Sequence, residues 1–205
     1  GNDLSAFGWT VTGAPPYIAP SGADFLTPDD KGTTGGVHLD TASDVIQSPP
    51  IFGDWSHGAA VTRLVGRLSN DGTPDMPRFL ICDFVARFSA NNAETGSGIG
   101  FVEDGGSAAV ANDHAAMIFT DGTSWKLRSG AATSAAIAAV DTSPHRFRIV
   151  LDRIAALAYG FVDNHDKLYG QSIAIEADEF PVCFGAGVVS GGSNDPVLSN
   201  VDIRY

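Results

Sequence analysis

Alternation between apolar and polar residues is the feature of this sequence that most limits its fold. Between Phe79 and Phe88 every second residue is apolar, and the segments 146–153 and 200–205 repeat the pattern. Successive side chains of a β-strand point to opposite faces, so this period predicts strands that bury one face. Asp83 and Arg87 lie on the other face among apolar residues, and we therefore expect that face to be partly buried.

Shorter segments predict further strands, separated by turn residues. We expect them at 7–11, 36–40, 60–68, 98–103, 116–120, 124–129, 157–163, 170–175 and 181–189. Asp121-Gly122 between two apolar runs indicates a tight hairpin. The Ala-rich segment 131–140 leaves two alternatives open, a single helical turn and a loosely paired strand. Many short strands with turns between them favour an all-β antiparallel sandwich or barrel, formed as one domain over 1–205.

The charge balance excludes several classes of partner. The chain has 12 Lys and Arg against 24 Asp and Glu, a net charge of −12. Nucleic-acid binding requires basic residues that displace counterions from phosphates, so we expect no nucleic-acid partner. Anionic membrane surfaces would repel such a chain, and no apolar run is long enough to insert into a bilayer.

The last third of the chain resembles a known superfamily. Several segments are similar to strands of concanavalin A-like lectins and glucanases, the laminin-G-like members in particular. They are His145 to Asp152, Ala158 to Asn164, Leu168 to Gly170 and Leu198 to Tyr205, with the opening Phe7 to Thr10. The resemblance implies a jelly-roll of two antiparallel sheets, often with a glycan-binding face. It does not fix the function, because the superfamily includes lectins, hydrolases, lyases and structural domains.

Signatures of catalysis are weak in this sequence. The glycosidases of the superfamily carry paired carboxylates on one strand, and the nearest match is Glu176 and Asp178, with Pro181 in place of the second glutamate. The Gln-Ile-His triplet of the lyases has only a partial counterpart at 171–173. The histidines are scattered without helical pairing, at His38, His57, His114, His145 and His165. We therefore expect no catalytic residues.

Aromatic side chains in polar surroundings are the candidates for glycan binding, because sugars present apolar C–H faces edged by hydroxyl groups. Trp55 lies in a polar loop between glycines, next to Asp54 and His57. Tyr159 and Tyr169 flank one turn, where they form either a binding platform or a cross-strand aromatic pair. Trp125 alternates with Lys126 and Arg128, so we expect it in the core.

Two further features leave alternatives open. Asp163, Asn164 and Asp166 offer oxygen ligands for calcium within four residues, although hairpin turns use the same residues for backbone hydrogen bonds. Cys82 and Cys183 each lie in an apolar run, and we expect buried free thiols, with a Cys82–Cys183 disulfide as the alternative.

The resemblance to the concanavalin A-like superfamily, with Trp55 as a locally motivated contact, implies a non-catalytic carbohydrate-recognition or adhesion module with a glycan as its partner. The alternatives are a structural module of a phage tail or surface assembly, which would form a homo-oligomer, and a glycan-processing hydrolase or lyase. The chain begins Gly1-Asn2 without a methionine, which indicates trimming and favours an extracellular, cell-surface or virion-associated location.

Overall fold

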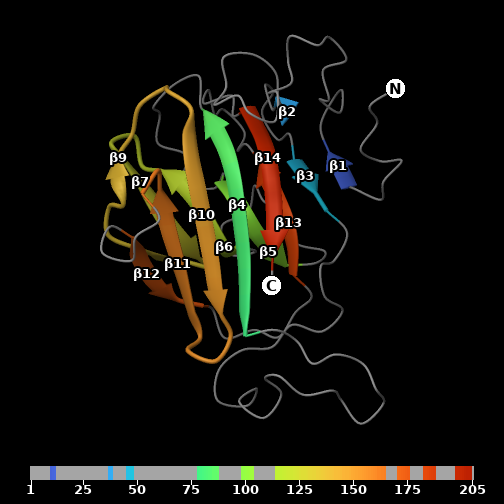
Figure 1. Cartoon of the computed structure of the whole chain (residues 1–205), viewed down its shortest axis with the longest axis vertical. Coiled ribbons are helices and arrows are strands. Elements are labelled where there is room, and N and C mark those ends of the chain that lie inside the picture. The colour runs from blue at the N-terminus through green and yellow to red at the C-terminus, as the bar shows by residue number, and fades with distance from the viewer. Residues whose placement is uncertain are drawn as a thin grey trace.

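The computed structural model describes residues 10–12, 37–38, 45–48, 78–87, 98–103, 114–164, 170–175, 182–187 and 197–204. Within these ranges the chain forms β-strands and no helix, and every strand pairing is antiparallel. The strands form two sheets that lie face to face (Figure 1). No helix in this part of the chain is long and apolar enough to cross a membrane.

The larger sheet has eight strands and lies behind the smaller one in Figure 1. Its order is β1 (Thr10–Thr12), β3 (Val45–Gln47), β13 (Val182–Gly187), β5 (Gly98–Glu103), β6 (His114–Thr120), β7 (Ser124–Ser129) and β8 (Ala132–Thr133), with β9 (Ala138–Ala139) also paired to β7. The smaller sheet has six strands in the order β12 (Gln171–Ala174), β11 (Leu157–Val162), β10 (His145–Asp152), β4 (Phe79–Arg87), β14 (Val197–Arg204) and β2 (Val37–His38).

Alternating side chains fill the space between the sheets, as the sequence predicts. From β4 the core receives Leu80, Cys82, Phe84 and Ala86, and from β10 it receives Phe147, Ile149 and Leu151. Trp125 of β7 is fully buried and lies edge-on to Phe147, with ring centroids 5.1 Å apart. The expected core position of Trp125 is therefore confirmed.

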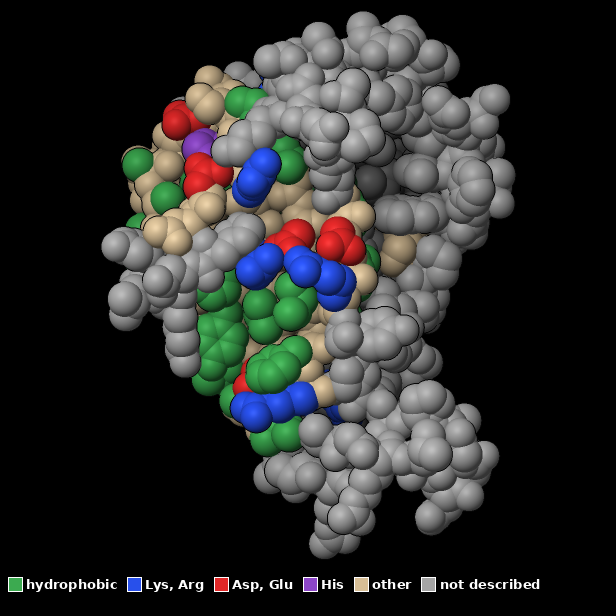
Figure 2. All heavy atoms as spheres, viewed as in Figure 1, with side chains coloured by type: hydrophobic (Ala, Val, Ile, Leu, Met, Phe, Trp, Pro, Cys, Tyr) green, Lys and Arg blue, Asp and Glu red, His purple; other side chains and the backbone are tan. Residues whose placement is uncertain are grey.

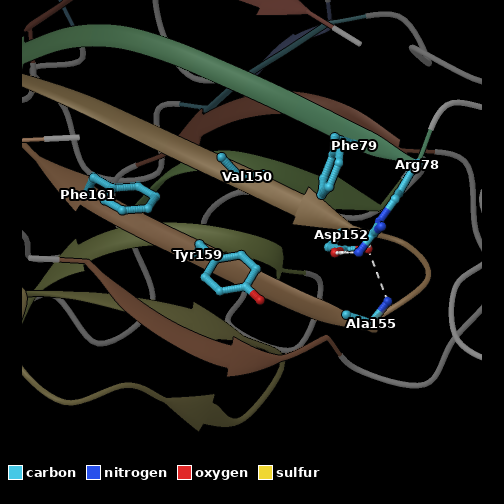
Figure 3. A pocket seen from close by; sticks show the side chains of 7 residues that line it. All are labelled: Arg78, Phe79, Val150, Asp152, Ala155, Tyr159 and Phe161. Atoms are coloured by element: carbon cyan, nitrogen blue, oxygen red, sulfur yellow. Dashed lines mark hydrogen bonds and ion pairs between the residues drawn. The ribbon is translucent and has the colours of Figure 1, made fainter. Parts of the chain in front are cut away.

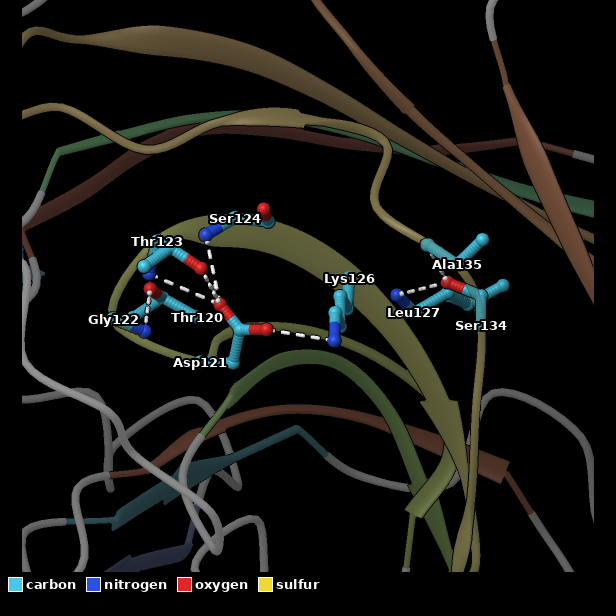
Figure 4. Close-up of polar contacts among 9 residues, drawn as sticks. All are labelled: Thr120, Asp121, Gly122, Thr123, Ser124, Lys126, Leu127, Ser134 and Ala135. Atoms are coloured by element: carbon cyan, nitrogen blue, oxygen red, sulfur yellow. Dashed lines mark hydrogen bonds and ion pairs between the residues drawn. The ribbon is translucent and has the colours of Figure 1, made fainter.

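The hairpin between β6 and β7 forms at the predicted Asp121-Gly122 turn (Figure 4). One carboxylate oxygen of Asp121 accepts hydrogen bonds from the backbone N–H groups of Thr123 and Ser124, at 3.0 and 2.8 Å. The other oxygen lies 2.6 Å from Nζ of Lys126. Gly122 has φ of 92°, a left-handed conformation that glycine adopts without steric cost.

Most predicted strands coincide with observed ones, and β5 and β7 have the predicted bounds. For the segment 131–140, where the sequence left a helical turn and a loosely paired strand as alternatives, the structure shows the short strands β8 and β9. β3 was not predicted, and the strand expected at 60–68 lies outside the described residues.

Cys82 is a fully buried free thiol, so the disulfide alternative is not formed. Its strand, β4, belongs to the six-stranded sheet, whereas Cys183 lies on β13 of the other sheet. Burial raises the pKa of the Cys82 thiol well above its usual range, which keeps the thiol protonated and unreactive.

Candidate functional site

A pocket of about 380 Å³ opens on the outer face of the six-stranded sheet, on the side away from the core. It lies where β4 begins and β10 ends, and β11 forms its other wall (Figure 3). Its lining combines aromatic and aliphatic side chains with one ion pair: Arg78, Phe79, Val150, Asp152, Ala155, Tyr159 and Phe161. Ligand pockets commonly have volumes of roughly 300–1,000 Å³ and a similar mixture of apolar walls and a few polar groups.

The sheet register brings these residues together. Asp152 is directly opposite Phe79 on β4, and Val150 is directly opposite Tyr159 on β11. Directly opposed residues of antiparallel strands present their side chains on the same face. Because the inward positions of β10 are filled by core residues, the outward positions carry the pocket.

An ion pair between Arg78 and Asp152 forms the polar part of the pocket. Nε of Arg78 donates to Oδ1 of Asp152 at 3.1 Å, and Nη2 donates to Oδ2 at 2.8 Å, so the contact is bidentate. Oδ1 also accepts hydrogen bonds from the backbone N–H groups of Ile154 and Ala155, each at 3.1 Å. Asp152 therefore holds both the guanidinium and the β10–β11 turn in place.

The two charges stabilise each other, which keeps both groups ionised. Burial raises the pKa of the Asp152 carboxyl, but hydrogen bonds from Arg78 and from two backbone N–H groups, with the charge of Arg78, outweigh it and leave the pKa lower than usual. The pKa of the Arg78 guanidinium is raised, mainly by its hydrogen bond to Asp152. Asp152 accepts four hydrogen bonds in this arrangement, and it anchors Arg78.

Aromatic rings form the apolar walls. The Phe79 ring is 40% exposed, and the Arg78 guanidinium carbon lies 4.7 Å from its centroid. The Tyr159 ring projects from β11 toward the pocket, beside Phe161 on the same strand (Figure 3). Any side chain at Gly170 would collide with the Phe161 ring, so this glycine allows the chain just before β12 to pack closely against β11.

Of the residues predicted to bind glycans, the structure places Tyr159 in the pocket. Its directly opposed residue on β12 is Ser172, and its proposed aromatic partner Tyr169 lies outside the described residues. Trp55, Asp54 and His57 also lie outside them.

Asp163 and Asn164, two of the three residues predicted to bind calcium, are not among the residues that line the pocket. Oδ1 of Asp163 accepts a hydrogen bond from the backbone N–H of Arg146 at 2.9 Å, and Oδ2 lies 2.7 Å from Nδ1 of His145. Asn164 is exposed beside Asp163, and Asp166 lies outside the described residues. Within the described ranges, no three His, Cys, Asp or Glu side chains gather as a metal site.

Sequence reasoning missed most of the pocket. Arg78 and Asp152 are separated by 74 positions, and only the pairing of β4 with β10 brings them together. One sequence feature that could have indicated the missed part of this pocket was Phe79, an aromatic residue in the predicted strand 79–88 at a position that faces away from the core.

No family model matches this chain, and no curated protein matches it. Among solved structures, a carbohydrate esterase from Shiga toxin-encoding bacteriophage phi24B superposes with a TM-score of 0.54 at 14% identity, over 98% of this chain and 91% of that chain. A polysaccharide lyase of family 18 gives a TM-score of 0.46 at 10% identity, over 98% of this chain and 95% of that chain. An alginate lyase from Alteromonas sp. 272 gives 0.45 at 9% identity, over the same shares of the two chains.

The superposition and the strand order agree on the fold. The chain is an all-β, antiparallel jelly-roll sandwich of two sheets, the fold class predicted from the sequence.

Proposed function

We propose that this protein recognises carbohydrate through the pocket between β4, β10 and β11. The observation that carries the proposal is the combination of an exposed Phe79 ring and the Tyr159 ring with a fixed guanidinium. Aromatic faces bind the apolar C–H faces of sugars, while planar donors bind their hydroxyl groups. The fold shared with a phage carbohydrate esterase supports the same class of ligand and an extracellular or particle-borne location.

Within the pocket, Arg78 acts as the hydrogen-bond donor. Within the part of the chain that the structure describes, one N–H group on Nε and one on Nη2 of Arg78 bind Asp152, and the other three of its five N–H groups can donate to ligand oxygens. The bidentate pair fixes the direction of these donors before a ligand arrives, and this lowers the entropy cost of binding.

The test is binding of a panel of polysaccharides, measured by isothermal titration calorimetry with the wild type and four variants. Phe79 and Val201 are the two large hydrophobic residues exposed among the described residues, at 40% and 38%, and only Phe79 lines the pocket. We expect Phe79→Ala and Tyr159→Ala to weaken binding about tenfold, roughly 1.4 kcal/mol, and Val201→Ala to leave it unchanged.

The variants also separate this pocket from the loop predicted by sequence. If Trp55→Ala abolishes binding at an unchanged melting temperature while Phe79→Ala has no effect, the binding site is the Trp55 loop and not the pocket. A parallel titration in EDTA tests the proposed calcium site at Asp163, Asn164 and Asp166, since loss of binding would assign it a role. Absence of binding to the whole panel would favour the structural alternative, for which a defined homo-oligomer is expected.

A second candidate is hydrolysis of ester groups on a glycan, favoured by the fold shared with the phage carbohydrate esterase. The experiment is release of acetate from acetylated polysaccharides by the wild-type protein, with heat-denatured protein as the blank. Release above the blank would assign a processing role, with the pocket as the glycan-binding part of the enzyme. Binding without release would assign recognition alone.

A further inference from the structure

The charged side chains next to the pocket neutralise one another. On the outer face of the same sheet, Arg148 of β10 donates to both carboxylate oxygens of Asp83 on β4, at 2.6 and 2.8 Å. Arg204 of β14 contacts Asp83 as well, and its Nε lies 2.9 Å from Asp202. These residues form a row of two arginines and two aspartates across three strands, which we call the ionic row.

An apolar strip lies between the ionic row and the Arg78–Asp152 pair. It consists of Tyr159, Val150 and Ile81, which the register places directly opposite one another on β11, β10 and β4. All three side chains are half-buried. Figure 2 shows apolar side chains on this face between two groups of charged side chains. Since neighbouring strands are about 4.8 Å apart, the strip spans roughly 10 Å across the sheet, and it adds Ile81 to the residues that line the pocket.

Both borders of this strip have no net charge. The ionic row and the pocket pair contain equal numbers of arginines and aspartates, each arginine being in contact with a carboxylate. The exposed Arg146 lies two residues before Arg148 on β10, so the ionic row separates it from the strip. An anionic sugar on the strip would meet three aspartates and would have to compete with them for their arginines.

Withdrawing Arg78 from Asp152 would cost free energy of binding. The Asp152 side chain is only 5% exposed, so a ligand carboxylate that withdrew Arg78 would leave a buried carboxylate without its counter-charge. The net charge of −12 on the whole chain adds long-range repulsion of a polyanion. A hydroxyl group, in contrast, accepts a hydrogen bond from Arg78 without disturbing the pair.

We infer that the ligand of this site is an uncharged glycan chain, lying across the strands along the apolar strip with one sugar in the pocket. The inference rests on the proposed function, which says only that the site binds carbohydrate. It adds the ligand class and extends the contact surface from the pocket to Ile81.

The test uses substrates and variants chosen to differ chiefly in charge. Polygalacturonate and its fully methyl-esterified form share one backbone, and a neutral panel of glucan, mannan, xylan and galactan accompanies them. Val150→Glu and Val150→Lys place opposite charges at the centre of the strip. Their melting temperatures are measured first, as a check that both variants fold. Binding is measured between about 20 and 500 mM NaCl, a range over which screening changes strongly.

We expect neutral polysaccharides to bind, with an affinity that changes less than about twofold across this salt range. Both Val150 variants should weaken neutral binding to a similar extent, about tenfold, because either charge must be desolvated. Tighter binding of polygalacturonate than of its methyl ester, strengthened by Val150→Lys and lost at high salt, would overturn the inference while leaving the proposed function intact. Absence of binding to every polysaccharide would overturn both.

Discussion

Replacement of Trp125 tests whether this indole is a core side chain or a sugar-binding surface. Trp125 is 0% exposed and lies edge-on to both Phe147 and His145, with centroids 5.1 and 6.2 Å apart. Truncation of a buried Trp to Ala costs about 3–5 kcal/mol, and each lost aromatic pair contributes roughly 0.5–1.5 kcal/mol of that total. We therefore expect Trp125→Ala to lower the free energy of unfolding by about 4 kcal/mol, a large part of the stability of a typical domain.

Trp125→Phe keeps a ring in the same space and provides the matched control. We expect it to cost about 2 kcal/mol and to leave polysaccharide binding unchanged. Urea denaturation followed by far-UV circular dichroism measures both variants, because this signal does not depend on the tryptophan that is replaced. A loss below about 1 kcal/mol for Trp125→Ala, or loss of binding in a fully folded Trp125→Phe, would refute the core assignment.

Three more substitutions or reactions test the packing and the electrostatics. Gly100 has φ of +154°, and a Cβ there would collide with a β6 carbonyl and a core side chain. Gly100→Ala should therefore lower the free energy of unfolding by about 3 kcal/mol, clearly more than Gly98→Ala on the same strand, and urea denaturation measures both. The Lys126 ammonium and turn N–H groups lower the pKa of Asp121 in the folded protein. The Asp121 carboxylate therefore contributes about 1 kcal/mol to the free energy of unfolding at pH values above its unfolded pKa near 4, and this contribution disappears as the pH falls through its folded pKa. The stability difference between wild type and Asp121→Ala should shrink accordingly in acid. Cys82 should react with a maleimide only at the rate of unfolding, and rapid alkylation of the native protein at this residue would contradict its burial.

The fold was accessible from the sequence because local alternation and turn chemistry determine most of the strands. Along most of β4 and β10 every second side chain is buried in the core, and Asp121-Gly122 is a turn whose hydrogen bonds are all local. β3 was missed because it has only three residues and its pairing with β1 and β13 is non-local. Three residues are too few for a period to be recognised.

The site was much less accessible than the fold. Tyr159 was predicted as a ligand-binding residue because it flanks a turn, a property that a sequence displays directly. The partnership of Arg78 with Asp152 and that of Arg148 with Asp83 depend instead on the register between β4 and β10, which joins positions 65 to 74 residues apart. A shift of that register by one residue would send these side chains to the core face, so no local pattern could identify them as neighbours.

The most direct test of the carbohydrate-binding account is an NMR titration of the protein with the tightest-binding polysaccharide fragment of the panel. The account predicts the largest shifts at Arg78, Phe79, Val150 and Tyr159, with little change at the β6–β7 turn on the other sheet. Shifts confined to that turn or to other loops, or no saturable shifts with any fragment, would contradict it.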